Sequence, residues 1–410
     1  MTAHACVVSQ RAYPGDVRLS TEILALQEAG YAVDVVSMRT PGEPNISHES
    51  GVAVYRIPSL MRSRAGKVRY VAEYVSFLIP ALLLLAWLQL RKRYRLVHVT
   101  NLPDVLVFSA LVPKLLGAKL IFDVRECTPE MFLDRFGATM DSKVMKLVIW
   151  LEQASIHFAD ATVTCTEAMR QALLSRGADP ASVSVMLNVG SSGIFLEPAV
   201  LPDPMATGPV RLVTHGTIIR RYGHETLIQA MAVVAKQTPN VHLDIFGRGN
   251  LLPDLEKMVE VLGLQEWVTF RGFVPDDVLL KHLRASHIGV VPLLRTPEAD
   301  LVHTFKMFEY IILGLPVIIS RTIGVEGYYD EQSVCYFEAG NAENLAQAIL
   351  DLAEHPEKRY QLAKHALKVY ERYSPAHERA RYRQIVQRLV QQPHSEGESA
   401  SVEAAYGKRS

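Results

Sequence analysis

An α/β fold with two Rossmann-like, doubly wound domains facing a central cleft is predicted for this chain by three observations. Short runs rich in β-branched residues alternate with segments of helical length, the pattern of parallel sheets covered by helices on both faces. The alternation is interrupted once, near residue 195, by a proline-rich stretch without periodicity. The length of 410 residues is enough for two or three domains, each with its own core.

The N-terminal half, residues 1–195, is expected to be one Rossmann-like domain. Strands are predicted from apolar runs at residues 4–9, 32–38, 52–57, 96–100, 119–124 and 161–165. Helices are predicted between them at residues 17–30, 104–117 and 141–159. The first of these helices is expected to stop at Gly30, because glycine readily adopts the left-handed conformation that ends many helices.

The C-terminal half repeats the alternation after a predicted linker at residues 196–210. A second Rossmann-like domain is expected at residues 211–375. Its strands are predicted at residues 210–215, 241–247, 268–272, 287–293 and 315–320, and its helices at residues 225–237, 251–263, 277–286 and 304–314. A last helix at residues 376–392 is expected to cross back to the N-terminal domain, and the polar tail at 393–410 to be disordered.

Composition excludes two classes of protein. The chain has 43 Lys+Arg and 43 Asp+Glu, hence no net charge, and 49% hydrophobic residues. A disordered chain would be less apolar, and a protein that binds nucleic acid by neutralising phosphates would carry a basic excess. The four cysteines lie far apart and no signal peptide precedes the first strand, so free thiols and a cytoplasmic location are expected.

Residues 74–90 form an uncharged apolar segment interrupted by Pro80. Three interpretations remain open: a buried helix, a helix lying in the membrane interface, or a membrane span, for which about 20 residues are needed. Four basic residues on each side, within residues 62–69 and 91–95, favour contact with an anionic membrane surface. We therefore expect peripheral membrane contact through residues 62–95, at the inner face of the cell membrane.

Two glycine-containing loops are candidates for binding an anion. The segment GTIIRRYG, residues 216–223, lies between a strand and a helix, where backbone N–H groups can face a diphosphate and Arg220 and Arg221 can add contacts. An ordinary turn with two solvated arginines is the alternative. The sequence FGRGN, which contains Gly247, follows the next strand and is weaker on its own.

Lys306 and Glu309 are three residues apart and share one face of a predicted helix. The cation could hold a phosphate, while the carboxylate could accept two ribose hydroxyl groups. The alternative is a surface ion pair worth under about 1 kcal/mol.

Taken in order, these segments resemble a known family. The succession GTIIRRYG, IFGRGN, VTFRGFVP, VVPL and FKMFEYIILGLPVIIS is similar to the C-terminal half of the GT-B glycosyltransferases. The most similar group is glycosyltransferase family 4, which makes bacterial polysaccharides and glycolipids. Residues 13–37 and 97–132 resemble the first loop and the acceptor-side core of that family. The resemblance extends over roughly residues 5–390.

The resemblance implies a role for each matching residue. Arg221, Lys306 and Glu309 would form the catalytic centre, with Glu309 as the second glutamate of the E-x7-E motif of the family. Leu301 stands where that motif has its first glutamate, with Asp300 next to it. The implied donor-binding residues are Gly216, Thr217, Arg220, Gly247, Phe273, Val274 and Asp300.

The acceptor side is implied to include Gly15, Asp123, Arg125 and Glu126. Arg125 stands where many relatives have a sugar-contacting histidine; it cannot act as a base near neutral pH, but it could bind the phosphate of a lipid-linked acceptor. Partners expected from the resemblance are a nucleotide-sugar donor and a glycan or lipid-linked acceptor, with no nucleic acid.

The resemblance also implies the reaction. A retaining glycosyltransferase would move a sugar from a nucleotide diphosphate sugar to a hydroxyl group in cell-surface polysaccharide synthesis. No cofactor and no metal ion are expected, and the sequence contains no D-x-D motif. The alternatives are a catalytically degenerate GT-B subunit that only binds nucleotide, and a nucleotide-sugar epimerase or a phosphorylase on the same fold.

Overall fold

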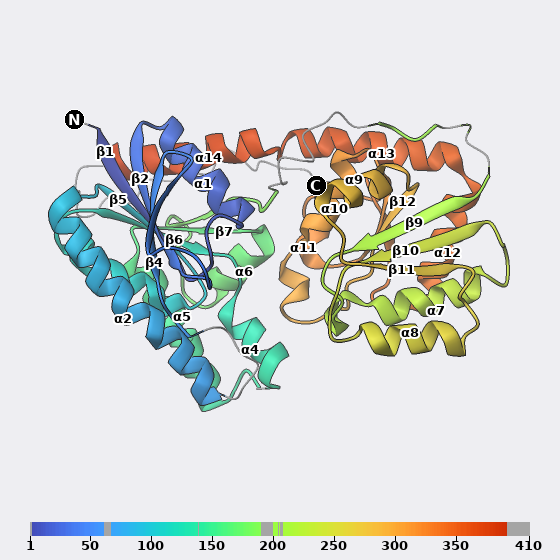
Figure 1. Cartoon of the computed structure of the whole chain (residues 1–410), viewed down its shortest axis with the longest axis horizontal. Coiled ribbons are helices and arrows are strands. Elements are labelled where there is room, and N and C mark those ends of the chain that lie inside the picture. The colour runs from blue at the N-terminus through green and yellow to red at the C-terminus, as the bar shows by residue number, and fades with distance from the viewer. Residues whose placement is uncertain are drawn as a thin grey trace.

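Two parallel sheets, one in each half of the chain, form the frame of the molecule (Figure 1). The computed structural model describes residues 2–60, 67–137, 139–189, 200–203, 205 and 208–391. Helices cover the sheets, and each sheet is buried at its centre. The predicted α/β class with two doubly wound halves is confirmed. Part of the predicted linker (residues 196–199, 204, 206 and 207) and the whole predicted tail fall outside the described residues.

The N-terminal sheet has eight strands in the order β3-β4-β2-β1-β5-β6-β7-β8. They are β1 Ala3–Ser9, β2 Tyr31–Met38, β3 Ile46–Glu49, β4 Val52–Ile57, β5 Leu96–Thr100, β6 Lys119–Val124, β7 Ala161–Thr164 and β8 Val183–Val185. All neighbours are parallel except β3, which pairs antiparallel with β4 at the edge. The edge strands β3 and β8 were not predicted, because they are short and partly exposed and lack a continuous apolar run.

Seven helices accompany this sheet in the described part of the N-terminal half. They are α1 Val17–Glu28, α2 Lys67–Lys92, the 3-10 helix η1 Asp104–Ala110, α3 Leu111–Leu115, α4 Thr128–Phe136, α5 Lys143–Phe158 and α6 Glu167–Ser175. The prediction of a single helix at residues 104–117 is wrong, because this segment is divided into η1 and α3. Pro113 lacks the N–H group that a continuous α-helix would need there, which explains the break.

The C-terminal sheet has the order β11-β10-β9-β12-β13-β14. Its strands are β9 Val210–His215, β10 Val241–Phe246, β11 Val268–Gly272, β12 Ile288–Val291, β13 Val317–Ser320 and β14 Cys335–Phe337. The strand order reverses between β9 and β12. In open parallel sheets, ligands bind at such a switch point, beyond the carboxyl ends of the strands.

The helices of the C-terminal half follow the predicted pattern with additional short turns. They are η3 Arg220–Tyr222, α7 His224–Val234, α8 Leu252–Val261, α9 Asp276–Arg284, η4 Ala299–Leu301, α10 Phe305–Ile312, α11 Ile323–Glu326, α12 Ala342–Glu354, α13 Pro356–Glu371 and α14 Pro375–Gln391. The loops that follow β9, β10 and β12 lie at the switch-point edge.

Helix α14 lies against the N-terminal half, beside α1 (Figure 1). Tyr382 is fully buried there, and its hydroxyl group is 2.7 Å from Nδ1 of His98 on β5. Glu378 accepts a hydrogen bond from the backbone of Leu187, and Arg383 pairs with Glu28. Helix α14 therefore joins the N-terminal half, although it follows the C-terminal sheet in the sequence.

Helix α2 packs on the N-terminal sheet with one face and leaves the opposite face outside. Phe77, Ala81 and Leu85 are buried in the core. The outward face carries a stripe of large exposed apolar side chains, which we call the outer stripe: Val71, Val75, Ile79, Leu83, Trp87 and Leu90. Among the described helices, α2 alone has the length and composition to cross a membrane, and 28% of its most apolar window is buried.

The four cysteines, Cys6, Cys127, Cys165 and Cys335, are all free thiols, as predicted.

Candidate active site

A cavity of about 580 Å³ lies between the two halves and is lined by both. A smaller hollow of about 380 Å³ shares His215, Gly216, Thr217 and Glu309 with it and extends over the C-terminal sheet. Of the predicted residues, the larger cavity is lined by Gly15, Arg125, Glu126, Gly216, Thr217, Arg221, Lys306 and Glu309. The smaller hollow adds Gly247, Phe273 and Val274.

Glycine is required at two positions beneath the cavity. Gly216 follows β9 with a φ of 112°, and a Cβ atom there would lie 2.7 Å from Cε of Lys306. Gly247 follows β10 with a φ of 128°, and its Cβ would lie 1.8 Å from the carbonyl oxygen of Gly216. The two loops therefore touch backbone to backbone, which leaves the space above them for a ligand.

Lys306 lies in the first turn of α10 and is 8% exposed. Its ammonium nitrogen is 3.6 Å from the centre of the Tyr222 ring, which η3 places beneath it. Among the described residues, no carboxylate forms an ion pair with this nitrogen. Burial, with a smaller contribution from Arg221, lowers the pKa of Lys306 to about 7. An anion in the cavity would restore the charged form.

Glu309 pairs with a histidine rather than with Lys306. Its Oε2 atom is 2.7 Å from Nε2 of His215, and Nδ1 of that ring is 2.8 Å from the hydroxyl group of Tyr310. The arrangement fits a ring that donates to Glu309 and accepts from the tyrosine. The other carboxylate oxygen of Glu309 is available to a ligand. His215 was not predicted from the sequence, although its position directly before Gly216 is a signal that could have identified it.

Arg221 lines the larger cavity and forms an ion pair with Glu298, another lining residue, at 2.7 Å. Burial acts against the charged guanidinium, but Tyr222 and Glu298 outweigh it and raise the pKa of Arg221. Burial also raises the pKa of Glu298. The neighbouring Arg220 is exposed and is not among the lining residues of either cavity, because η3 turns it outward.

Two further predicted residues do not line the cavities. Asp300 lies in η4 and is paired with Arg295 at 2.8 Å, while Glu298 and Ala299 line the larger cavity in its place. Asp123 is fully buried beneath the cavity floor. Phe273, in contrast, is 68% exposed at the rim of the smaller hollow, with the Arg248 guanidinium 4.6 Å from its ring centre.

Arg125 lines the cavity and is held by three carboxylates. Its Nε donates to Asp123 at 2.5 Å, one Nη to Asp16 at 2.6 Å and the other to Glu22 at 2.9 Å. Burial disfavours the charge, but Asp123, Glu22 and Asp16 raise the pKa of Arg125. Each of its three nitrogens donates to a carboxylate, so Arg125 helps to position the floor of the cavity. A phosphate contact through its remaining N–H groups stays a prediction.

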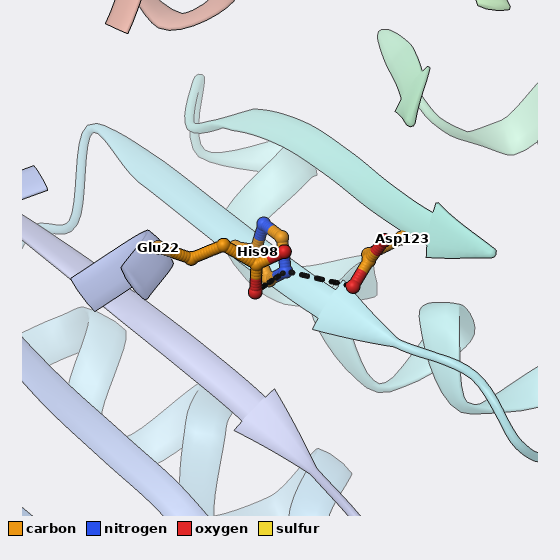
Figure 2. Close-up of side chains that lie close together, drawn as sticks. All are labelled: Glu22, His98 and Asp123. Carbon is orange, nitrogen blue, oxygen red and sulfur yellow. Dashed lines mark ion pairs between the residues drawn. The ribbon is translucent and has the colours of Figure 1, made fainter. Parts of the chain in front are cut away.

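A buried polar cluster lies below this floor (Figure 2). Glu22 of α1, His98 of β5 and Asp123 of β6 come together there, with Nε2 of His98 3.2 Å from Glu22 and 3.9 Å from Asp123. Arg18 donates to both oxygens of Asp123, at 2.7 and 3.2 Å. Burial would raise the pKa of Asp123, but Arg18 and Arg125 hold it well below its ordinary value.

The same three side chains offer ligand atoms close enough together for a metal ion. The donor set does not fit one, because Arg18 and Arg125 already hydrogen-bond to the carboxylate oxygens and supply the positive charge. We therefore describe the cluster as an ion-pair network. Arg18, Glu22 and His98 were missed from the sequence, since they come from separate segments without a shared motif.

Family models match both halves of the chain. Residues 209–355 match the model described as "Glycosyl transferases group 1", and residues 17–188 match "Glycosyl transferase 4-like domain". Together the two matches contain every predicted site residue except Gly15.

Two curated relatives are similar over part of their length. The chain is 22% identical over 268 residues to alpha-D-kanosaminyltransferase of Streptomyces kanamyceticus, covering 63% of this chain and 67% of that protein. It is 26% identical over 171 residues to the GDP-mannose-dependent alpha-(1-6)-phosphatidylinositol monomannoside mannosyltransferase of Mycolicibacterium smegmatis. That alignment covers 38% of this chain and only 44% of the mannosyltransferase.

Solved structures are similar over nearly the whole chain. Sucrose-phosphate synthase from Thermosynechococcus elongatus has a TM-score of 0.75 at 18% identity, covering 94% of this chain and 99% of that one. HepE of Anabaena in complex with UDP has a TM-score of 0.71 at 14% identity, covering 94% of this chain and all of that one. At these identities the likeness establishes a shared fold.

Proposed function

The chain belongs to the group 1 glycosyltransferases and has their GT-B fold, and on that premise we propose that it is a retaining enzyme of glycolipid or polysaccharide synthesis. It would transfer a sugar from a nucleotide diphosphate sugar to a hydroxyl group of a glycan or lipid-linked acceptor. One observation carries the proposal: the Gly216 loop, Lys306 and Glu309 form one wall of a cavity whose opposite wall carries Arg125 and Glu126.

The diphosphate of the donor would lie on the Gly216 loop between Lys306 and Arg221. The glycine leaves room for phosphate oxygens to approach the backbone, and Thr217 adds a hydroxyl group. Lys306 is buried, where charge on a phosphate is stabilised more strongly than in water, and Arg221 adds a second cation that is partly open to solvent. The solved structure of HepE, a structural neighbour, is a complex with UDP, which supports a nucleotide in this position.

The nucleoside would occupy the smaller hollow. The free oxygen of Glu309 can accept hydrogen bonds from the ribose hydroxyl groups, while His215 holds the carboxylate in place. The exposed ring of Phe273 and the side chain of Val274 offer an apolar surface for the base, and Gly247 lets the β9 and β10 loops approach. The proposal thus assigns donor binding to the C-terminal half.

Transfer would proceed through an oxocarbenium-like transition state, with the acceptor hydroxyl group attacking from the face that the nucleotide leaves. Negative charge grows on the departing phosphate, and Lys306 and Arg221 are placed to neutralise it. On this proposal side chains supply that charge and no metal ion takes part. The Arg125 network keeps the acceptor side rigid, and the orientation of the two reactants contributes the rest of the catalysis.

The acceptor would be delivered at a membrane. The outer stripe of α2 and the exposed Arg91 and Arg93 beside it form an apolar surface with basic residues at its border. The Mycolicibacterium smegmatis relative is named as a mannosyltransferase of phosphatidylinositol monomannoside, a lipid, which is compatible with a lipid-linked substrate for this chain. Residues 62, 64 and 67, which belong to the other basic flank, have no described side chains.

Nucleotide release from a panel of UDP-, GDP- and ADP-sugars in the presence of membrane lipid tests the proposal. Lys306→Ala should lower turnover at least tenfold, because the leaving phosphate loses a cation. Lys236→Ala, at an exposed turn position two residues after the end of α7, is the matched control and should leave turnover unchanged. If no donor in the panel releases its nucleotide, the transferase proposal is refuted. If Lys306→Ala keeps full activity, this lysine is not part of the site.

A further inference from the structure

An apolar pocket of about 360 Å³ opens beside the acceptor wall, separate from the two cavities described above. Helices α2, α4 and α5 and the loop before η1 enclose it. Its walls include Val75 and Leu78 of α2, Phe132 and Phe136 of α4, and Val148 and Leu151 of α5. Its volume falls within the range of small-molecule sites, and nothing in the proposed reaction uses it.

The pocket adjoins the proposed acceptor site through one short segment of chain. Arg125 and Glu126 line the catalytic cavity, while Thr128 and Phe132, two and six positions after Glu126, line the apolar pocket. Asn101 ties the two sides together, because it donates to the carbonyl oxygen of Glu126 and to the carboxylate of Asp104, which borders the pocket. A molecule with its tail in the pocket could therefore place its polar end near the cleft.

The surface around the pocket has the character of a lipid-binding face. Val75 belongs both to the pocket wall and to the outer stripe of α2, so the two are continuous. On the other side, α5 exposes Leu147 and Trp150 next to the exposed Lys146. An apolar opening with a cation beside it is complementary to a hydrocarbon chain attached to a phosphate.

From these observations we infer that the pocket binds the hydrocarbon chain of a phosphate-bearing, lipid-linked acceptor, and so sets the position of the acceptor hydroxyl group. The inference rests on the proposed function and makes it more specific. The chain of the acceptor is favoured over a partner protein, because the segment from Arg125 to Phe132 connects the pocket to the catalytic cavity, and this connection serves only a molecule that reaches both spaces.

Decyl and dodecyl monophosphate, kept below their micelle-forming concentrations, are suitable probes for calorimetric titration of the full chain. Each buried methylene should tighten binding roughly threefold to fourfold, so the two-carbon difference should change the dissociation constant on the order of tenfold. A dodecyl phosphate with a photoreactive chain end should label α4 or α5. Labelling confined to the outer stripe, or affinity independent of chain length, would overturn the inference.

Two glutamate substitutions in the outer stripe separate the pocket from the membrane surface. Val75→Glu places a charge at the pocket wall, whereas Ile79→Glu lies one turn further along the stripe and is not a lining residue. Val75 is 42% exposed and Ile79 is 55% exposed, so both variants should fold, which melting curves would check. Both should weaken binding to anionic vesicles to a similar extent.

Only Val75→Glu should weaken dodecyl phosphate binding, by at least tenfold; equal binding by the two variants would contradict the pocket. Val148→Trp, which fills the pocket from α5, should also weaken dodecyl phosphate binding by at least tenfold, and it replaces Val75→Glu as the test if that variant fails to fold. Nucleotide release keeps the two proposals apart. If the protein binds dodecyl phosphate in the pocket but turns over no donor, the transferase proposal is refuted and the lipid site stands. If it turns over a donor but does not bind dodecyl phosphate, the lipid site is refuted and the transferase proposal stands.

Discussion

The ammonium group of Lys306 lies 3.6 Å above the ring centre of Tyr222, and no described carboxylate pairs with it. The aromatic face gives partial compensation for a buried cation, worth about 2 kcal/mol at a desolvated site. Burial nevertheless lowers the pKa of this lysine to about 7. The site is therefore prepared for an anion, whose arrival would stabilise the charge that the protein alone holds weakly.

Binding of a nucleoside diphosphate should weaken as the pH rises from 7 to 9. The empty protein loses the Lys306 proton near pH 7, whereas the bound phosphate would hold that proton to a higher pH, so binding requires proton uptake in this window. The expected loss of affinity for UDP, GDP or ADP, whichever binds, is roughly 10- to 50-fold. Titration calorimetry in buffers of different ionisation enthalpy would measure both the affinity and the proton uptake.

Lys306→Met is the control for this pH dependence. The variant should bind nucleotide more weakly at pH 7 and show little change up to pH 9, because the titrating group is gone. A wild-type protein whose affinity stays constant over these two pH units would show that Lys306 does not contact the phosphates.

Gly247→Ala should destabilise the C-terminal half, since its Cβ would lie 1.8 Å from a backbone oxygen of the Gly216 loop. The two strand-end loops would have to separate, and the positive φ adds strain, together about 2 to 4 kcal/mol in unfolding free energy. Urea denaturation would measure the change. Gly327→Ala, where the added atom meets only an ordinary contact at 3.8 Å, should have little effect, and equal stability of both variants would contradict the backbone packing seen here.

Removal of the Arg125 guanidinium should be costly, because Asp16, Glu22 and Asp123 would lose a shared partner below the cavity floor. Breaking a buried network by deleting one member costs about 3 to 5 kcal/mol, so Arg125→Met should lower the unfolding free energy by that order. Arg295→Met breaks the exposed pair with Asp300 and should change stability too little to measure. Similar denaturation midpoints for the two variants would show that the floor does not depend on Arg125.

Much of the frame was predictable because it depends on local patterns. The buried strands have continuous apolar runs, and Gly216, Lys306 and Glu309 stand in a recognisable order, so their placement in one cavity followed from the fold. The edge strand β3 was not predictable, since its pairing with β4 depends on a neighbour rather than on an apolar run.

The floor of the cavity shows the limit of sequence interpretation most clearly. His98 and Tyr382 are separated by 284 positions and share a hydrogen bond only because α14 returns to the N-terminal half. A buried charge is also indistinguishable from a surface charge in the sequence: Arg125 looked free to bind phosphate, but its partners come from α1, its N-cap and β6. Partners of this kind are known only once the segments are placed together.

Helix α2 raises the same difficulty for membrane binding, because hydropathy cannot distinguish a buried apolar face from an exposed one. We expect the outer stripe to enter the interface of an anionic membrane, with Arg91 and Arg93 contacting headgroups, each worth about 1 kcal/mol. Reversing both charges (Arg91→Glu with Arg93→Glu) should lower binding to phosphatidylglycerol vesicles at least tenfold in a flotation assay. Lys236→Glu with Lys257→Glu makes the same charge change on the C-terminal half and should leave binding unchanged. If the first double variant floats with vesicles as well as the wild type does, the basic border of α2 is not the membrane contact.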